Sequence, residues 1–168
     1  HRIHLIKEAT KAKAKQMVIK EIPRRKITAI AVAPNTTDDM FECYDHSLQK
    51  NMRQMDDSLF SGDIGVTVAK KGFMQNEFQA YSSVFILLDY MPYEVHNSDE
   101  IKEGLYACSY HHGPYEETDA TYKELLAYID QEGYEVSGDA IEIGLIDWSV
   151  TENPEEQVTE IQIPIMKK

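Results

Sequence analysis

The feature that most constrains the fold is an order of predicted elements that occurs twice along the chain. A strand, a helix and two further strands are predicted between Ile27 and Tyr90, and the same order is predicted between Gly104 and Ile165. These spans are 64 and 62 residues long. Equal order and near-equal length predict a duplicated unit, so we expect an α+β fold with antiparallel sheets and helices on one sheet face.

The first half follows an alternating strand at residues 16–22 that Pro23 interrupts. Thr36 can cap the helix of this half, which runs to about Gln54. Its other predicted segments are strands at 26–33, 64–69 and 79–89, turns at 61–63 and 70–72, and a polar link at 94–103.

The second half has the clearer helix signals. Gly113 and Pro114 precede its start, and Gly133 ends it. Tyr122 lies on its apolar stripe, so we expect Tyr122 and Tyr128 to be structural. The other predicted segments are strands at 104–111, 139–146 and 157–166, a turn region at 135–138 and a loop at 151–156.

One carboxylate lies inside the aliphatic strand 139–146. Period-two alternation puts Ile141, Ile143 and Leu145 on one face and Glu142 on the other. We therefore expect Glu142 to face out of the core, into surroundings that ten tyrosines can wall in. An acid among aromatic rings favours a cation. The alternative is an ordinary exposed carboxylate.

The two units cover each other's bare sheet faces only in part. We therefore predict a cleft at their pseudo-two-fold junction, which is a common place for small molecules to bind.

The charge of the chain is strongly asymmetric. Residues 1–26 hold nine of the 17 basic residues and two of the 29 acidic ones, so residues 27–168 carry 8 basic against 27 acidic residues. Such an acidic body repels nucleic acid and admits cationic small molecules, although a merely solvated surface has the same charge. The longest apolar run, residues 84–88, suits a buried strand, so we expect no membrane segment.

The start of the chain resembles a linker. Residues 1–15 are rich in Lys and Ala and suit a helix end, and no signal peptide follows His1, so we expect a fragment of a longer cytoplasmic protein. Cys43 and Cys108 are too few for a disulfide framework and suit apolar filling. The adjacent His111 and His112 point to opposite strand faces, so we expect no metal site, and no motif indicates a cofactor.

Four short motifs resemble one family. They are residues 104–108 (GLYAC), 113–115 (GPY), 139–142 (DAIE) and 158–165 (VTEIQIPI). Their order and spacing resemble the GyrI-like effector-binding domains, in particular the C-terminal ligand-sensing half of MerR-type multidrug-responsive transcription activators. The resemblance covers residues 16–168, and residues 1–15 resemble the end of those regulators' dimerisation helix.

The resemblance implies a pocket in which a buried glutamate meets lipophilic cations among aromatic rings. Glu142 occupies the matching position, and Tyr44 and Tyr81 resemble two pocket tyrosines. Gln157, Gly113 and Thr118 stand where multidrug sensors carry aromatic residues, so other rings would have to refill the pocket. The expected ligand-binding residues are Glu142, Tyr44, Tyr81, Tyr106, Tyr110, Trp148, Gly144 and Gln157.

The expected function is therefore a small-molecule effector-binding domain of a bacterial transcription regulator. Such a protein would contact DNA only through an upstream domain and would be a homodimer at full length. Some GyrI-like relatives are hydrolases of strained-ring natural products, so an enzyme with Glu142 as general base is the alternative. A module that masks another protein's surface is a third possibility.

Overall fold

The computed structural model describes residues 17–31, 64–88, 99–146 and 152–168. Its strands are β1 (Val18–Ile22), β2 (Arg25–Ala31), β3 (Ile64–Val68), β4 (Tyr81–Leu87), β5 (Asp99–Ile101), β6 (Gly104–His112), β7 (Tyr134–Val136), β8 (Ala140–Ile146) and β9 (Val158–Lys167). The α-helices are α3 (Lys70–Phe73) and α4 (Asp119–Gln131), and short 3₁₀ turns lie at Tyr115–Glu117 and Pro154–Glu156. Among these residues, no helix has the length and apolar character needed to cross a membrane.

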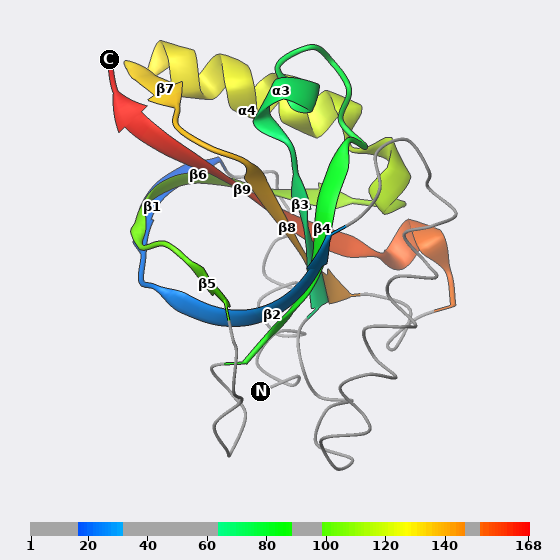
Figure 1. Cartoon of the computed structure of the whole chain (residues 1–168). Coiled ribbons are helices and arrows are strands. Elements are labelled where there is room, and N and C mark those ends of the chain that lie inside the picture. Colours follow the sequence, from blue (N-terminus) through cyan, green and yellow to red (C-terminus); the bar gives the residue numbers. More distant parts are fainter. Residues whose placement is uncertain (1–16, 32–63, 89–98, 147–151) are drawn as a thin grey trace.

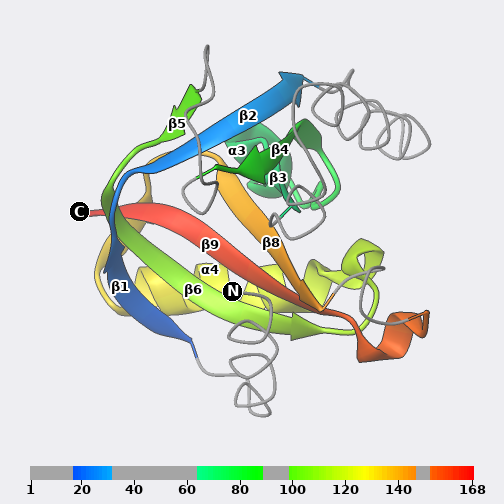
Figure 2. The ribbon, with the colours of Figure 1, turned by 90° about the horizontal axis from the view of Figure 1, so that it is seen from below.

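The strands form one curled antiparallel sheet in the order β1-β6-β9-β8-β3-β4-β2-β5, and β7 pairs with β9. Only Pro23 and Arg24 separate β1 from β2, although these strands lie near opposite ends of the order. The sheet therefore curves back toward itself as a half-barrel (Figures 1 and 2). This agrees with the expected antiparallel sheet.

The two sheet faces have separate cores. The convex face carries α4 and α3 (Figure 1), and its buried side chains include Val68, Tyr122, Leu125, Ile161 and Ile163. The concave face gathers another cluster from strands that are not neighbours in the sheet: Ile27, Phe85, Tyr106, Ile141 and Ile143. Because side chains alternate along each strand, one strand contributes to both cores.

Helix α4 forms because its apolar residues recur at helical spacing. Thr121, Tyr122, Leu125 and Ile129 are its buried residues, and they face the convex side of the sheet. The chain then turns at Gly133, whose φ of +84° is a left-handed conformation that suits glycine. The stripe and the end of this helix are both as predicted.

The strands predicted at 16–22, 26–33, 64–69, 79–89, 104–111, 139–146 and 157–166 are confirmed, with ends shifted by a few residues. Three predictions are wrong. Residues 70–72 begin helix α3, where Gly72 packs so closely on Ala80 that a Cβ would lie 2.3 Å from the Ala80 Cβ. The link 94–103 contains β5, and the turn region 135–138 overlaps β7. Both strands have three residues and exist through pairing with β2 and β9 rather than through their own pattern.

The two predicted halves meet at one strand pair. Strands β6, β9 and β8 lie on one side of the sheet and β3, β4 and β2 on the other, so the antiparallel pair of β3 and β8 is the junction. The helix predicted at 36–54 and the linker at 1–15 lie outside the described residues.

Candidate functional site

Glu142 lies near the centre of β8, where the two predicted halves meet. Its neighbours across the sheet are Val66 of β3 and Ile161 of β9. Its exposed fraction is 2%, so Glu142 is buried, as the resemblance implies, but the prediction that it faces out of the core is wrong. Alternation correctly separates Glu142 from Ile141 and Ile143, but the face that it occupies is the convex one, which has a core of its own.

One hydrogen bond anchors the Glu142 carboxyl. The Tyr122 hydroxyl on α4 donates to Glu142 Oε2 at 2.7 Å, in a buried setting. The rings of Phe73 and Phe78 pack against Tyr122, with centroid separations of 5.7 and 5.2 Å. Tyr122 is thus structural, as predicted, but it is also the partner of Glu142. Helical periodicity places the ring in the core and carries no signal for where its hydroxyl points.

Burial dominates the electrostatics of this pair. Burial raises the pKa of the Glu142 carboxyl to about 8. The hydrogen bond from Tyr122 lowers this pKa, but its effect is the smaller of the two. Burial and the adjacent carboxyl raise the pKa of Tyr122 well above its usual range. Among the described residues no cationic side chain pairs with Glu142. At neutral pH the Glu142 side chain is therefore mainly a neutral carboxylic acid.

Two further candidates lie on the same sheet face as Glu142. Tyr81 begins β4 opposite Val68 and is buried in the same core as Tyr122. Gly144 is two residues after Glu142 and pairs with Thr159 of β9. The convex face thus brings Glu142, Tyr81 and Gly144 to one side.

Tyr106 and Tyr110 lie on the other face. Both pack in the concave core, whereas the alternate residues of β6, such as Ala107 and His111, face the convex side. The expected grouping of these two tyrosines with Glu142 is therefore wrong, because the sheet lies between them. The sequence pattern defines faces within one strand but does not relate the faces of β6 and β8.

The remaining candidates are dispersed. Gln157 is buried before β9, and its carbonyl accepts a hydrogen bond from the Gly113 N–H at 2.8 Å. Its side-chain Nε2 is buried and has no hydrogen-bond partner among the described residues. Tyr44 and Trp148 lie outside the described part of the chain.

His111 has a structural environment. Its Nδ1 lies 3.0 Å from the Thr121 hydroxyl, and its Nε2 lies 2.8 Å from the Pro114 carbonyl oxygen. These two contacts connect β6 to α4 and to the segment before it. Within the described ranges, no group of three His, Cys, Asp or Glu residues is placed to hold a metal ion. Cys108 is buried, and burial raises the pKa of its thiol to about 12.

The family of the chain follows from comparison with known proteins. A family model described as the GyrI-like small molecule binding domain matches residues 15–166. The chain belongs to the GyrI-like family. No curated protein sequence matches it.

Solved structures share the fold. The MerR-type regulator EcmrR, in a complex with DNA, superposes with a TM-score of 0.71 at 18% identity, covering 99% of this chain and 63% of that one. The EcmrR C-terminal domain gives a TM-score of 0.66 at 20% identity, covering 92% and 99%. This chain therefore spans 63% of the length of the longer EcmrR chain.

Two more distant relatives have the same fold. A hydrolase from Listeria innocua has a TM-score of 0.55 at 14% identity, covering 95% of this chain and 97% of that one. The protein SAV2435, solved with tetraphenylphosphonium bound, has a TM-score of 0.52 at 14% identity, covering 90% and 94%.

Proposed function

We propose that this chain is the effector-binding domain of a bacterial transcription regulator and that its ligand is a lipophilic cation held against Glu142. The observation that carries this proposal is a carboxyl group with an exposed fraction of 2% that lacks a cationic partner among the described residues. A buried acid of this kind is costly unless it stays neutral or gains a cation.

The chemistry follows from the two states of Glu142. In the empty site the carboxyl keeps its proton. A cation placed beside it favours the carboxylate, so binding releases that proton. The Tyr122 hydroxyl already donates to Oε2 and continues to stabilise the carboxylate. Aromatic rings near Tyr122, which include Phe73 and Phe78, attract a cation through their faces.

The position of Glu142 at the β3–β8 pair fits a site shared by two halves. Under the duplication that we propose, the helix predicted at residues 36–54 is the counterpart of α4. Tyr44 would then complete the site from the first half, as Tyr122 does from the second. Ligand binding across this junction would change the position of the two halves relative to each other, and with it the position of any attached domain.

Relatives support both parts of the proposal. A protein of this fold binds tetraphenylphosphonium, a lipophilic cation, and EcmrR forms a complex with DNA. By this analogy an upstream domain contacts DNA, the full-length regulator is a cytoplasmic homodimer, and the acidic body of the present chain takes no direct part in DNA contact.

The test is a calorimetric titration with tetraphenylphosphonium at pH 8.5, where Glu142 is mostly ionised. We expect Glu142→Gln to weaken binding by about 2 kcal/mol, or roughly 30-fold, because a charge-assisted contact in a dry site is lost. Glu160→Gln is the matched control, since Glu160 is a buried acid on the opposite sheet face that pairs with Lys20. Equal affinity of Glu142→Gln and wild type would reject the role of Glu142.

The second candidate function is hydrolysis of strained-ring natural products. It is favoured by the raised pKa of Glu142, which suits proton transfer near neutral pH, and by the hydrolase that shares the fold. Incubation with an epoxide-bearing or cyclopropane-bearing substrate, followed by mass spectrometry, separates the two functions. Product that disappears in Glu142→Gln supports the enzyme, whereas saturable cation binding without product supports the sensor.

A further inference from the structure

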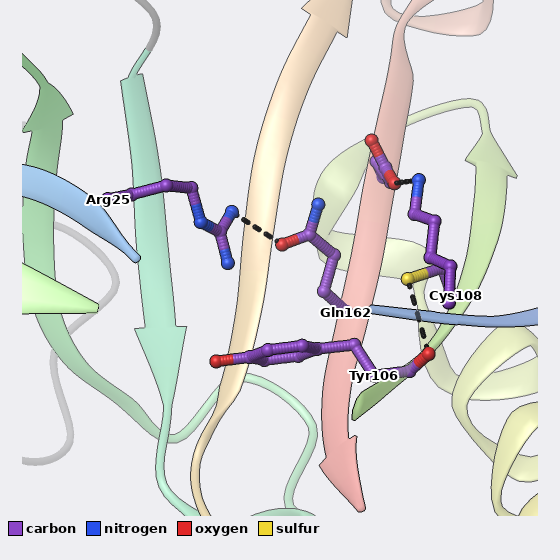
Figure 3. Close-up of polar contacts among 6 residues, drawn as sticks. Arg25, Tyr106, Cys108 and Gln162 are labelled. Atoms are coloured by element: carbon purple, nitrogen blue, oxygen red, sulfur yellow. Dashed lines mark hydrogen bonds and ion pairs between the residues drawn. The ribbon is translucent and has the colours of Figure 1, made fainter. Parts of the chain in front are cut away.

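The concave face of the sheet holds a polar cluster that the Glu142 site does not use. Arg25 of β2 reaches across the face to Gln162 of β9, and its Nη1 donates to Gln162 Oε1 at 2.7 Å (Figure 3). Its guanidinium carbon lies 5.6 Å from the centre of the Tyr106 ring. The Tyr106 hydroxyl is itself occupied, because it donates to the Lys102 carbonyl oxygen at 2.7 Å.

The opposite edge of the Arg25 guanidinium lacks a hydrogen-bond partner among the residues that the structure describes. Both Nε and Nη2 are buried, and neither makes a hydrogen bond among the described residues. These two nitrogens form the side of the guanidinium that presents two parallel N–H donors, which is the geometry that binds a carboxylate through both oxygens. Leaving such donors buried and unpaired is unfavourable.

The charge balance of the cluster also favours an anion. Lys20 is compensated, because its Nζ lies 3.0 Å from Glu160 Oε1. The contacts of Arg25 among the described residues are with the neutral Gln162 and the Tyr106 ring. The Cys108 thiol in the same cluster stays neutral, since burial raises its pKa to about 12. Among the described residues, Arg25 therefore has no acidic partner on this face.

The surroundings define the rest of the ligand. The concave core supplies apolar side chains from several strands: Ile27, Phe85, Leu87, Ile101, Ile141 and Ile143. Arg25 as a whole is half-buried, whereas its Nε and Nη2 are buried. A ligand for this place needs a planar oxyanion head and an apolar body.

We infer that the concave face is a second ligand site, distinct from Glu142, in which Nε and Nη2 of Arg25 bind the carboxylate of a small aromatic or aliphatic acid. Tyr106 supports the guanidinium from below and Gln162 fixes its orientation. The sheet separates this site from the acid on the convex face, so the protein has one place for a cation and another for an anion.

The test compares benzoate with benzamide, which has the same size and no charge, by calorimetry on the whole chain. We expect saturable binding of benzoate that is at least tenfold tighter than that of benzamide. Arg25→Lys keeps the charge but removes the two-donor edge, so we expect it to weaken benzoate binding by roughly tenfold or more. Arg24→Lys is the control, because Arg24 is exposed and pairs with Glu100, and it should bind benzoate as the wild type does.

A second readout does not depend on a variant that folds. In ¹H–¹⁵N spectra of the wild type, the Arg25 Nε–H resonance should move with saturating benzoate and stay in place with benzamide. Equal affinities for benzoate and benzamide, or an Arg25 Nε–H resonance that does not move when benzoate is added, would overturn the inference. Neither result bears on cation binding at Glu142.

Discussion

Cation affinity should depend steeply on pH, because the ligand requires Glu142 in its ionised form. With a pKa of about 8, only about one protein molecule in eleven has Glu142 ionised at pH 7, and about one in a hundred at pH 6. Tetraphenylphosphonium keeps its charge at every pH. Its apparent affinity should therefore rise roughly 50-fold between pH 6 and pH 8 and change little above pH 9.

Proton release gives an independent measure of the same event. At pH 7 each bound cation should release about 0.9 proton, because that fraction of the empty sites is protonated. Calorimetric titrations in two buffers of different ionisation enthalpy measure this number. Glu142→Gln should lose both the proton release and the pH dependence, while Glu160→Gln should keep them. Affinity that is constant from pH 6 to pH 9, with no proton released, would refute the reasoning.

Three further predictions concern the same residues and their packing. The folded state holds the Glu142 proton more tightly than the unfolded state does, so protonation of Glu142 adds to the free energy of unfolding. This contribution is complete below pH 4.5 and disappears as pH rises toward about 8. A shift of 3.5 in pKa corresponds to about 5 kcal/mol, and urea denaturation at pH 5 and pH 8.5 should show a loss of this order that Glu142→Gln abolishes. Tyr122→Phe removes the hydrogen bond that lowers the Glu142 pKa, so the midpoint of the affinity profile should move to higher pH; an unchanged midpoint would contradict the contact. Gly65→Ala should lower the free energy of unfolding, measured by thermal denaturation, by about 1–3 kcal/mol. The reason is that a Cβ there would lie 2.3 Å from Phe85 Cζ and 2.6 Å from the Glu142 carbonyl oxygen. A stability equal to wild type would contradict this packing.

The strands were predictable where their own residues carry the signal. The β8 segment alternates over its whole length, and the correct separation of Glu142 from Ile141 and Ile143 follows from that alternation alone. Strands β5 and β7 were not predictable, because three residues carry no period and their pairing is set by distant partners.

The candidate site was predictable only in part. Glu142 was identified, but its burial depends on α4 and on the convex core, and a strand pattern does not say what covers each face. The helical pattern predicts that Tyr122 lies in the core, but it does not predict the hydrogen bond from its hydroxyl to Glu142. The sequence predicts Tyr106 and Tyr110 as pocket residues from their positions alone, whereas the register of β6 against β9 decides which sheet face they occupy.

The Arg25 cluster was even less predictable from the sequence than the surroundings of Glu142. Arg25 lies 137 positions before Gln162, and β4, β3 and β8 separate their strands in the sheet. Only the curl of the sheet brings the two side chains together, and no local pattern encodes that curl (Figure 2).

The most direct measurement is a ¹³C NMR titration of the Glu142 side-chain carboxyl, without and with tetraphenylphosphonium. We expect a midpoint near pH 8 in the empty protein and a midpoint lowered by at least one pH unit in the saturated protein. A carboxyl that titrates near its ordinary value of 4.5, or one whose midpoint does not move when the cation binds, would contradict a buried neutral acid that ionises to hold a positive ligand.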